Sequence, residues 1–458
     1  MDYQVKQVGN HRGKPRLYFQ ARKLGQHGFA PGTRYSIQTT GAKVTLKVDP
    51  QGAYLVSRKE ETPVIDINSA ETLAPFMNVD AVKVTFGPDT ITIGKLASHT
   101  NKVDRLARLK SATAAGIAVM GLAFGGGILD NAAHAGMVDA GLQPRTVLVN
   151  EIDNDLLAHA QRANPVIDKD TILVSAPMQE VIQDDAFMAS VPRADVLVAG
   201  IPCSGASKAG KSKNGNTIME AHPEVGHLAH AFLVFLQKAQ PSVFLLENVP
   251  EYADSASAQI IRQQARDMGY TTHEVVLDAS EFGSMEKRVR WFMVGATTGV
   301  QLDLSNLAPA QPPVRTVASI LDTHGDHHWG TFQYLKDKAV RDKEAGKGFQ
   351  MQVVNPTSTR VPTLRKGYHK GGSTDPLLQH PDNADMLRLF SGDEHARIKG
   401  VDPKLVAGLS NTDKHIILGQ GVCPGPVRAI AQRIGAAILE AQHQISDTRV
   451  GLYQKVVG

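Results

Sequence analysis

The chain begins with short runs in which apolar and polar residues alternate or β-branched residues dominate. These runs read RLYFQA, YSIQTT, KVTLKV, AYLVS, VKVTF and TITIG, and Gly, Pro and Asp separate them. Alternation with a period of two is typical of strands that bury one face, and the separating residues are typical of turns. The pattern therefore predicts a small all-β module over residues 1–98.

From about residue 110 the pattern changes to apolar runs that alternate with longer amphipathic segments. The runs expected to form strands are GIAVMGLAF, TVLVNE, TILVSA, DVLVAGI, VFLLENV, HEVVLD and RWFMVGA. Segments such as GHLAHAFLVFLQKA and ASAQIIRQQARDMG have the spacing of helices. This alternation predicts an α/β fold with a doubly wound sheet, in which ligands bind outside the carboxyl ends of the strands.

A Pro-rich stretch, APAQPPVR, follows Leu304 and ends this pattern. Residues 322–360 are polar and rich in His, Lys and Gly, and we interpret them as part of a recognition insert. The segment GPVRAIAQRIGAAILEAQHQI has the spacing of a helix that packs back on the sheet. The expected parts are the N-terminal module over 1–98, an α/β domain over 110–304, a recognition region over 305–375 and a C-terminal segment over 376–458 that completes the α/β domain.

Composition narrows the class of protein. An apolar fraction of 42% over 458 residues is enough for a substantial core, so we expect a globular chain. The polar N-terminus and the lack of a run of about 18 apolar residues predict a cytoplasmic protein without a membrane partner. A net charge of +4 favours an acidic partner without deciding one. The only two cysteines, Cys203 and Cys423, lie far apart, so no disulfide framework is expected.

Three strand ends carry polar groups suited to catalysis. Cys203 follows DVLVAGIP and begins a Gly- and Ser-rich loop, where a thiol can act as a nucleophile. Glu247 and Asn248 end VFLLENV, where a buried carboxyl could act on a base. Arg288 and Arg290 alternate at strand spacing and therefore point to one face. Each feature alone is more often structural, as core packing, a helix cap or a solvated face, but their joint occurrence favours chemistry.

The same segments resemble those of a known family. The runs DVLVAGIPCSGASKAGKSKNG, FLLENVPEY and EFGSMEKRVRWFMVG resemble, in order, the catalytic, Glu-Asn-Val and Arg-x-Arg motifs of the cytosine-5 DNA methyltransferases. GLAFGGGILDNAAHAGM resembles the family's Gly-rich cofactor loop, VLVNEIDNDLLAHAQRANP its ribose-binding strand and helix, and GQGVCPGPVRAIAQRI its C-terminal motif. The resemblance covers about residues 115–440.

This resemblance implies a Rossmann-like methyltransferase sheet and transfer of a methyl group from S-adenosyl-L-methionine to C5 of a cytosine flipped out of double-stranded DNA. In that chemistry the thiolate of Cys203 adds to C6, Glu247 acts at N3, and Arg290, together with Arg288, contacts the base. The residues implied in cofactor binding are Leu122, Gly126, Gly127, Glu151, Ile152, Pro202, Gln420 and Val422. Those implied in DNA binding are Ser207, Lys208, Lys336, Lys338, Arg341, Lys343, Lys347, Arg365 and Lys366. No metal site is expected.

Several positions depart from the family's motifs. Met120 to Phe124 stand where the cofactor loop usually begins Asp-Leu-Phe-x-Gly, so an acidic and an aromatic contact are missing. Residues 175–177, Ser-Ala-Pro, stand where the third strand commonly ends in Asp. Ser204 replaces the Gln after Pro-Cys, Glu286 replaces the Gln that opens the Arg-x-Arg motif, and Gln420 replaces the Asn of the last motif. A looser, rearranged or adapted cofactor pocket follows from these changes.

The N-terminal module lies outside this resemblance. It is weakly similar to small swapped-hairpin barrels, many of which bind DNA, and a barrel for oligomerisation or packing fits the pattern equally well. The segment before VPTLRKGYHKGGSTDPLL is short for a target-recognition region, which suggests the hypothesis that the N-terminal module adds DNA contacts.

Other functions stay open at this point. A branch of the family methylates transfer RNA with the same thiol and carboxyl. The altered cofactor loop also fits a DNA-binding regulator that masks cytosine without methyl transfer. A nucleotide-dependent oxidoreductase fits least, because it gives no role to Cys203, Glu247 and Arg290 together. The recognition sequence, the oligomeric state and the existence of a cognate restriction endonuclease are not determined by the sequence.

Overall fold

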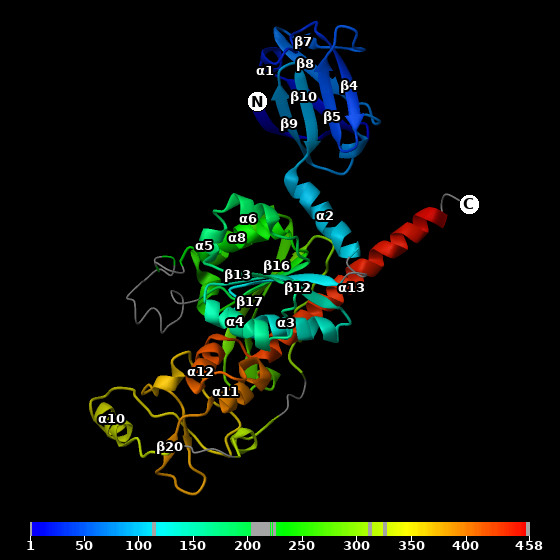
Figure 1. The fold of residues 1–458 in the computed structure, drawn as a ribbon. Helices are drawn as coiled ribbons and strands as arrows, with labels where there is room; N and C mark the ends of the chain where they lie inside the picture. The colour runs from blue at the N-terminus through cyan, green and yellow to red at the C-terminus, as the bar shows by residue number, and fades with distance from the viewer. Residues whose placement is uncertain are drawn as a thin grey trace. The chain divides into compact units, whose positions relative to one another are not determined.

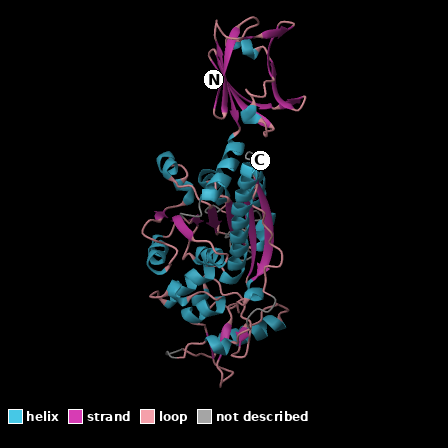
Figure 2. Cartoon of the chain, turned by 90° about the vertical axis from the view of Figure 1, so that its right-hand side faces the viewer, coloured by secondary structure: helices cyan, strands magenta, loops and turns pink. Residues whose placement is uncertain are grey.

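The computed structural model describes residues 2–111, 116–202, 220, 222, 226–309, 314–323 and 328–454, with side chains described up to residue 443. The chain divides into two compact units, residues 1–104 and 105–458. Strands dominate the first unit, whereas the second combines a sheet with helices (Figures 1 and 2).

Two antiparallel sheets form the N-terminal unit. The six-stranded sheet has the order β1 (Asp2–Gln7), β9 (Ala81–Gly87), β10 (Thr90–Lys95), β5 (Lys43–Val48), β4 (Arg34–Thr40) and β6 (Tyr54–Leu55). The four-stranded sheet has the order β2 (Gly9–His11), β3 (Lys14–Gln20), β8 (Thr62–Ile67) and β7 (Ser57–Lys59). Two short helices are α1 (Lys23–Gln26) and the 3-10 helix η1 (Ala74–Phe76).

Alternate side chains from both sheets share one apolar core, with Leu17 from β3 and Val84 from β9 among its members. The prediction of an all-β module is therefore confirmed. The run AYLVS is divided between the sheets, with buried Val56 between β6 and β7. Strands β1, β2 and β8 had no counterpart among the predicted runs. Strand β8 contains a proline, which usually argues against a strand.

Helix α2 (Ala97–Ser111) begins in the first unit and ends in the second. Its buried Arg105 donates to Thr297 Oγ1 at 3.0 Å, to Gln240 Oε1 at 2.5 Å and to the carbonyl oxygen of Met268 at 2.7 Å. A buried guanidinium with three acceptors holds the C-terminal half of α2 firmly on the second unit.

The second unit is organised around a seven-stranded sheet. Its strand order is β13 (Ile172–Ser175), β12 (Pro144–Glu151), β11 (Ile117–Leu122), β14 (Val196–Ala199), β15 (Val243–Asn248), β17 (Val289–Thr297) and β16 (Tyr270–Asp278). The first five are parallel, and β17 is antiparallel to both of its neighbours. All seven predicted runs form these strands, so the α/β prediction is confirmed. The chain order reverses at β11, where β12 and β14 flank it, which is where such sheets bind ligands.

Helices cover both faces of this sheet (Figure 1). One face packs Val119 and Val198 against α3 (Ile128–Asp139) and α13 (Pro424–Gln454), and the other packs Met120 and Leu197 against α8 (Leu228–Ala239) and α9 (Ala256–Asp267). Burial on both faces explains why the strand runs are almost continuously apolar. Helix α13 is the predicted C-terminal helix, and it approaches α3 so closely that a Cβ on Gly435 would lie 2.6 Å from Ala140 Cβ.

The remaining elements lie near the sheet edges or in the segments after β17. They are α4 (Asn154–Ala163), α5 (Met178–Val181), α6 (Asp185–Ser190), η3 (Pro250–Asp254), η4 (Ala279–Phe282), η5 (Val317–Ile320), α10 (Gln333–Glu344), β18 (Val353–Val354), η6 (Tyr368–Lys370), β19 (Leu377–Gln379), β20 (Leu387–Arg388), α11 (Gly392–Lys399), η7 (Pro403–Val406) and α12 (Asn411–Gln420). Strands β18, β19 and β20 form a small sheet. Among the helices that the structure describes, none is both long and apolar enough to cross a membrane.

Candidate active site

Glu247 lies at the carboxyl end of β15, next to the antiparallel strand that carries Arg290. Its Oε1 is 3.0 Å from Arg290 Nε, and both side chains are largely buried. A Cβ on Gly200 would lie 3.7 Å from Glu247 Oε2, so the carboxyl faces the segment that leads into Cys203. Burial raises the pKa of Glu247, and the cations nearby, Arg290 first, only partly oppose this. A carboxyl of this kind can hold a proton at a pH where an exposed glutamate would not.

Asn248 fixes the start of the predicted nucleophile loop. Its buried Nδ2 donates to the carbonyl oxygen of Ile201 at 3.1 Å, and its Oδ1 accepts from Val249 N at 2.9 Å. The end of β15 therefore holds the main chain just before Pro202, which is exposed. Cys203 itself lies outside the described residues, as do Ser207 and Lys208 among the predicted DNA contacts.

Cys423, the second cysteine, has the environment of a structural thiol. It is 3% exposed, and burial raises its pKa to about 11. Its Sγ lies 3.4 Å from Ser284 Oγ and 3.5 Å from Glu286 Oε2. A thiol with this pKa stays protonated and unreactive near neutral pH, so Cys423 does not compete for the role of nucleophile.

The two arginines of the Arg-x-Arg motif have different partners. Arg288 is buried, with Nη1 3.2 Å from Glu286 Oε1, and its Nη2 donates to the carbonyl oxygens of Gly419 at 3.0 Å and Gln420 at 3.4 Å. Arg290 instead faces Glu247. Arg288 therefore binds the C-terminal end of α12, which includes the predicted cofactor residue Gln420 and precedes Val422, whereas Arg290 lies with the predicted catalytic carboxyl.

The Gly-rich loop after β11 is held by polar side chains from two other segments. Glu151 Oε2 accepts from Gly125 N at 2.6 Å, and Asn164 Nδ2 donates to the carbonyl oxygens of Gly126 at 3.2 Å and Gly127 at 3.0 Å. Gly127 has a positive φ of 71°, which favours glycine. Asn164 was not among the predicted cofactor residues, although it lies in the Asn-Pro pair after α4, within the segment that resembles the family's ribose-binding strand and helix.

The Gly-rich loop lies against two other segments that contain predicted cofactor residues, the end of β12 with Glu151 and the helix α12 that ends at Gln420. A Cβ on Gly126 would lie 2.6 Å from Ile417 of α12, so the loop passes closely against the helix that ends at Gln420. Next to Glu151, Ile152 is 64% exposed, an unusual state for an isoleucine. The side chain of Leu122 lies in the apolar core on the α8 side of the sheet. Its carbonyl oxygen accepts a hydrogen bond from Gly200 N at 3.3 Å.

A buried carboxyl that the sequence analysis missed lies beside this loop. Asp130, in the first turn of α3, is 2% exposed, and its Oδ1 has no hydrogen-bond partner in the described chain. A Cβ on Gly121 would collide with this oxygen, so the carboxyl fills the space above the end of β11. Burial raises its pKa to about 8. An acid in the first turn of a helix is normally interpreted as a partner of the helix dipole, so the position of Asp130 in the sequence indicates no other role.

These groups fit S-adenosyl-L-methionine, which carries a sulfonium and an ammonium group, a ribose diol and an adenine ring. Glu151 offers a carboxylate for hydroxyl groups, and the unpartnered Asp130 oxygen offers an acceptor for a cation. The exposed side chain of Ile152 offers an apolar surface for a ring. Asp130 thus brings an acidic group from α3 to the end of β11, beside a loop that lacks one in its own sequence.

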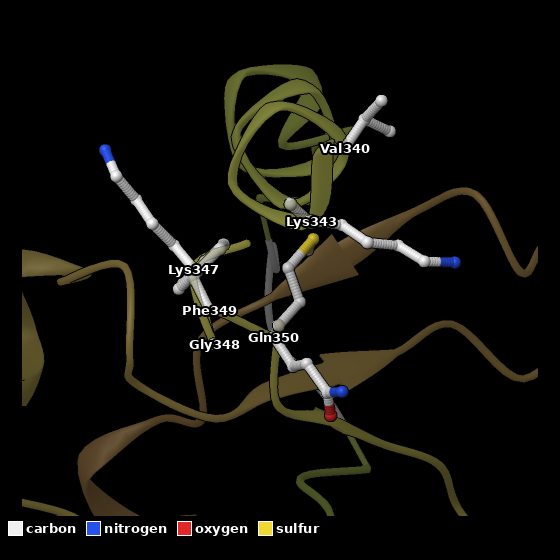
Figure 3. A pocket seen from close by; sticks show the side chains of 8 residues that line it. Val340, Lys343, Lys347, Gly348, Phe349 and Gln350 are labelled. Carbon is white, nitrogen blue, oxygen red and sulfur yellow. The ribbon is translucent and has the colours of Figure 1, made fainter. Parts of the chain in front are cut away.

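The predicted DNA-binding side chains of α10 and the segments after it lie on the surface. Lys336 pairs with Asp385 at 3.1 Å, Lys338 with Asp342 at 2.5 Å and Arg365 with Asp375 at 2.7 Å. Arg341, Lys343, Lys347 and Lys366 are exposed. Figure 3 shows Lys343 and Lys347 extending in opposite directions from a surface pocket next to α10, which also includes Phe349. None of the predicted catalytic residues lines this pocket.

Comparisons with known proteins agree with this arrangement. The family model described as C-5 cytosine-specific DNA methylase matches residues 132–436. The type II methyltransferase M.MspI of Moraxella sp is 27% identical over 260 residues, which are 56% of this chain and 59% of that protein. M.NlaX of Neisseria lactamica is 28% identical over 280 residues, which are 59% of this chain and 83% of that protein. The chain thus matches about three fifths of the length of M.MspI.

Solved structures share the fold. The methyltransferase EhMeth of Entamoeba histolytica aligns with a TM-score of 0.55 at 15% identity, and the Dnmt2 methyltransferase of S. pombe with 0.51 at 18% identity. Each alignment covers 71% of this chain and 98% of the other. Since the family model matches more than half of the sequence and spans Glu247, Arg290 and the turn after α12, the chain belongs to the C-5 cytosine-specific DNA methylase family.

Proposed function

We propose that this protein transfers a methyl group from S-adenosyl-L-methionine to C5 of a cytosine in double-stranded DNA. The observation that carries the proposal is the position of Glu247, a buried carboxyl of raised pKa that pairs with Arg290 and faces the segment leading into Cys203. Family membership and the type II methyltransferase relatives support DNA as the substrate.

The chemistry requires a nucleophile, because C5 of cytosine alone is too weak to attack a methyl group. The thiolate of Cys203 adds to C6, and the C5–C6 double-bond electrons become available at C5. When bound, S-adenosyl-L-methionine supplies an electrophilic methyl group on sulfur. Loss of the C5 proton then restores the double bond and expels the Cys203 thiolate. The target base must leave the duplex stack to reach these groups.

Glu247 assists the addition to C6 by donating a hydrogen bond or proton to N3 of the base. Its raised pKa favours the protonated form that can donate. Arg290 keeps the carboxyl in a fixed orientation at 3.0 Å and can contact the base itself. Asn248 keeps the root of the Cys203 loop beside this carboxyl through its bond to Ile201.

Glu151, Asp130, Ile152 and the turn at Gln420 and Val422 would hold the cofactor. Glu151 would accept from ribose hydroxyls while it accepts from Gly125 N of the Gly-rich loop. Asp130 would accept a hydrogen bond from a cationic group through its unpartnered Oδ1. The turn is held by Arg288, which links the cofactor side of the site to the strand that carries Arg290.

The test is trapping of a covalent adduct. Purified protein is incubated with tritiated S-adenosylmethionine and duplex DNA that contains 5-fluorocytosine, which cannot lose fluorine as it would lose a proton. We expect a labelled, denaturation-resistant adduct in the wild type and in Cys423→Ser, and none in Cys203→Ser. An adduct with structured RNA alone would replace DNA by RNA as the substrate. DNA binding without any adduct would replace the enzyme by a DNA-binding regulator.

A further inference from the structure

The net positive charge of the protein lies in the N-terminal unit, which is outside the family match. Of the 49 Lys and Arg residues, 14 lie within residues 1–104, together with 9 of the 45 Asp and Glu residues. The rest of the chain has one acidic residue more than basic residues, so the whole net charge of +4 comes from the smaller unit. Positive charge confined to one compact unit is typical of binding to a polyanion.

The strand pairing shows where part of this charge lies. In the six-stranded sheet, Val44, Leu46, Val84, Ile91 and Ile93 point into the core, and the residues between them point outward. The register aligns Thr45, Thr92, Thr85 and Tyr3 in one row across four strands. Lys43 and Lys83 lie in the next row on either side of Gly94, and Lys47 lies in the row on the opposite side.

This outward face contains no acidic residue. At the outward positions of β1, β9, β10, β5 and β4, which the structure describes in full, no Asp or Glu occurs. Tyr3 and Val5 are 61% and 53% exposed at its β1 edge. The outward face of the four-stranded sheet differs, because its Arg16 pairs with Asp66 at 2.7 Å. Of the two outward sheet faces that the structure describes in this unit, the face of the six-stranded sheet is the one that offers cations and hydroxyl groups without carboxylates.

We propose that this face, defined by Tyr3, Lys43, Thr45, Lys47, Lys83 and Thr92, binds the phosphate backbone of duplex DNA. The inference rests on the proposed function, since its partner is the substrate DNA. Ammonium groups bind phosphates as point charges, and threonine hydroxyls donate to phosphate oxygens without reading base sequence. The face therefore contributes affinity rather than sequence choice.

Such a contact raises the DNA concentration that the second unit experiences. Helix α2 joins the two units in one chain, so DNA held by the first unit stays within reach of the second. This needs no fixed arrangement of the units. It also suits a recognition region in which Lys336, Lys338 and Arg365 already pair with carboxylates of the same chain.

The test uses the full chain with Lys43, Lys47 and Lys83 all changed to Gln, and measures binding to nonspecific duplex DNA by fluorescence anisotropy at several salt concentrations. Each lost phosphate contact should reduce the log–log salt slope by about 0.9, so the triple variant should lose about 2.7 of the slope and bind at least about ten-fold more weakly at about 0.1 M salt. The matched control changes Lys14, Arg58 and Lys59 to Gln, which removes the same charge from the four-stranded sheet. We expect the control slope to change by less than about one.

Equal effects of the two triple variants would overturn the proposal, because net charge alone would explain them, and so would an unchanged slope. Stronger loss of binding to structured RNA or to phosphatidylserine vesicles than to duplex DNA would assign the face to another partner. The adduct assay at saturating DNA separates this inference from the proposed function. A triple variant that forms the adduct normally but binds DNA weakly supports the face as a DNA anchor, whereas absence of the adduct in the wild type refutes the enzyme and leaves the slope test intact.

Discussion

Glu247, at the end of β15, and Glu286, shortly before β17, both lie buried beside an arginine, yet their pKa values are shifted in opposite directions. Burial raises the pKa of Glu247, and Arg290 compensates only partly. Burial also acts on Glu286, but Lys399 and then Arg288 outweigh it and hold its pKa below the ordinary value. Lys399 Nζ lies 2.7 Å from Glu286 Oε2. The pKa of Glu286, with two cations in direct contact, is therefore lowered, whereas the pKa of Glu247 beside Arg290 stays raised.

This difference separates a chemical role from a structural one. A carboxyl that holds a proton can donate it to a base, whereas a permanently ionised one can only bind cations and amides. Glu286 binds Lys399 of α11, Arg288, and the amide of Leu364 at 3.1 Å, and so joins three segments distant in sequence. Asp130 is a third buried carboxyl of the second unit, and it has no cation partner among the described residues.

The largest expected effect is on catalysis by Glu247→Gln. Gln keeps the shape but cannot transfer a proton to N3, so kcat should fall by about 10²- to 10⁴-fold while DNA and cofactor binding persist. Methyl transfer under single-turnover conditions measures the chemical step. Glu440→Gln, which neutralises an exposed carboxylate on α13, is the matched control. A loss of less than about three-fold in Glu247→Gln would assign the acid role to another group.

Next in size is the stability cost of Glu286→Gln. This change leaves Lys399 and Arg288 buried together without their anion, which should cost about 3–5 kcal/mol of unfolding free energy. The double change with Lys399→Met should recover at least half of that loss, because the excess buried charge disappears. Urea unfolding followed by tryptophan fluorescence measures the second unit alone, since Trp291 and Trp329 both lie in it.

Additive effects of the two changes would contradict a direct ion pair. Lys399→Met alone should cost less than Glu286→Gln, because Arg288 and the Leu364 amide remain as partners of the carboxylate. The reverse order would mean that the carboxylate depends on Lys399 more than on Arg288.

A pH-dependent effect is expected at Asp130. Its pKa of about 8 in the folded protein exceeds the ordinary aspartate value of 3.8, so between these values the native state keeps a proton that the unfolded chain has released. Stability should therefore fall as pH rises through this window, by at most about 1.4 kcal/mol per pH unit. Asp130→Asn removes this slope. From pH 6 to pH 7.5 the wild type should lose about 2 kcal/mol more than the variant in urea unfolding, and parallel curves would show that Asp130 is ionised in the native state.

The fold was largely predictable because its signals are local. Most strands of the large sheet are nearly continuous apolar runs, and burial on two faces produces that pattern directly. The edge strand β16 is half-exposed and contains several polar residues. The antiparallel direction of β17 was not predicted, since periodicity carries no information about strand direction. Strand β1 was not predicted, although its Tyr3 and Val5 alternate with polar residues as in other strands, and both side chains are exposed.

Site residues could be predicted from the sequence where they belong to a motif at the end of a strand. The residues that contact them from distant parts of the chain could not. Glu247 and Arg290 lie beside one another at the end of β15, and Glu151 contacts the Gly-rich loop at Gly125. Glu286 was recognised as a departure from the family, but its partner Lys399 lies 113 positions away and reads as an ordinary basic residue in the last turn of a helix. Only packing shows that its ammonium group is fully buried.

The smallest effect should distinguish the two arginines. Arg288→Lys keeps the charge but loses the guanidinium that donates to the carbonyl oxygens of Gly419 and Gln420. Loss of a charged hydrogen bond at the cofactor turn should raise the KM for S-adenosylmethionine by about ten-fold and leave kcat within about three-fold. Arg290→Lys should act in the opposite way, lowering kcat more than it raises this KM, because Arg290 faces Glu247. Steady-state kinetics at saturating DNA measure both. If Arg288→Lys lowered kcat and left the cofactor KM unchanged, Arg288 would contact the base, as the sequence motif first implied. The proposal that Arg288 serves the cofactor side and Arg290 the catalytic carboxyl would then be wrong.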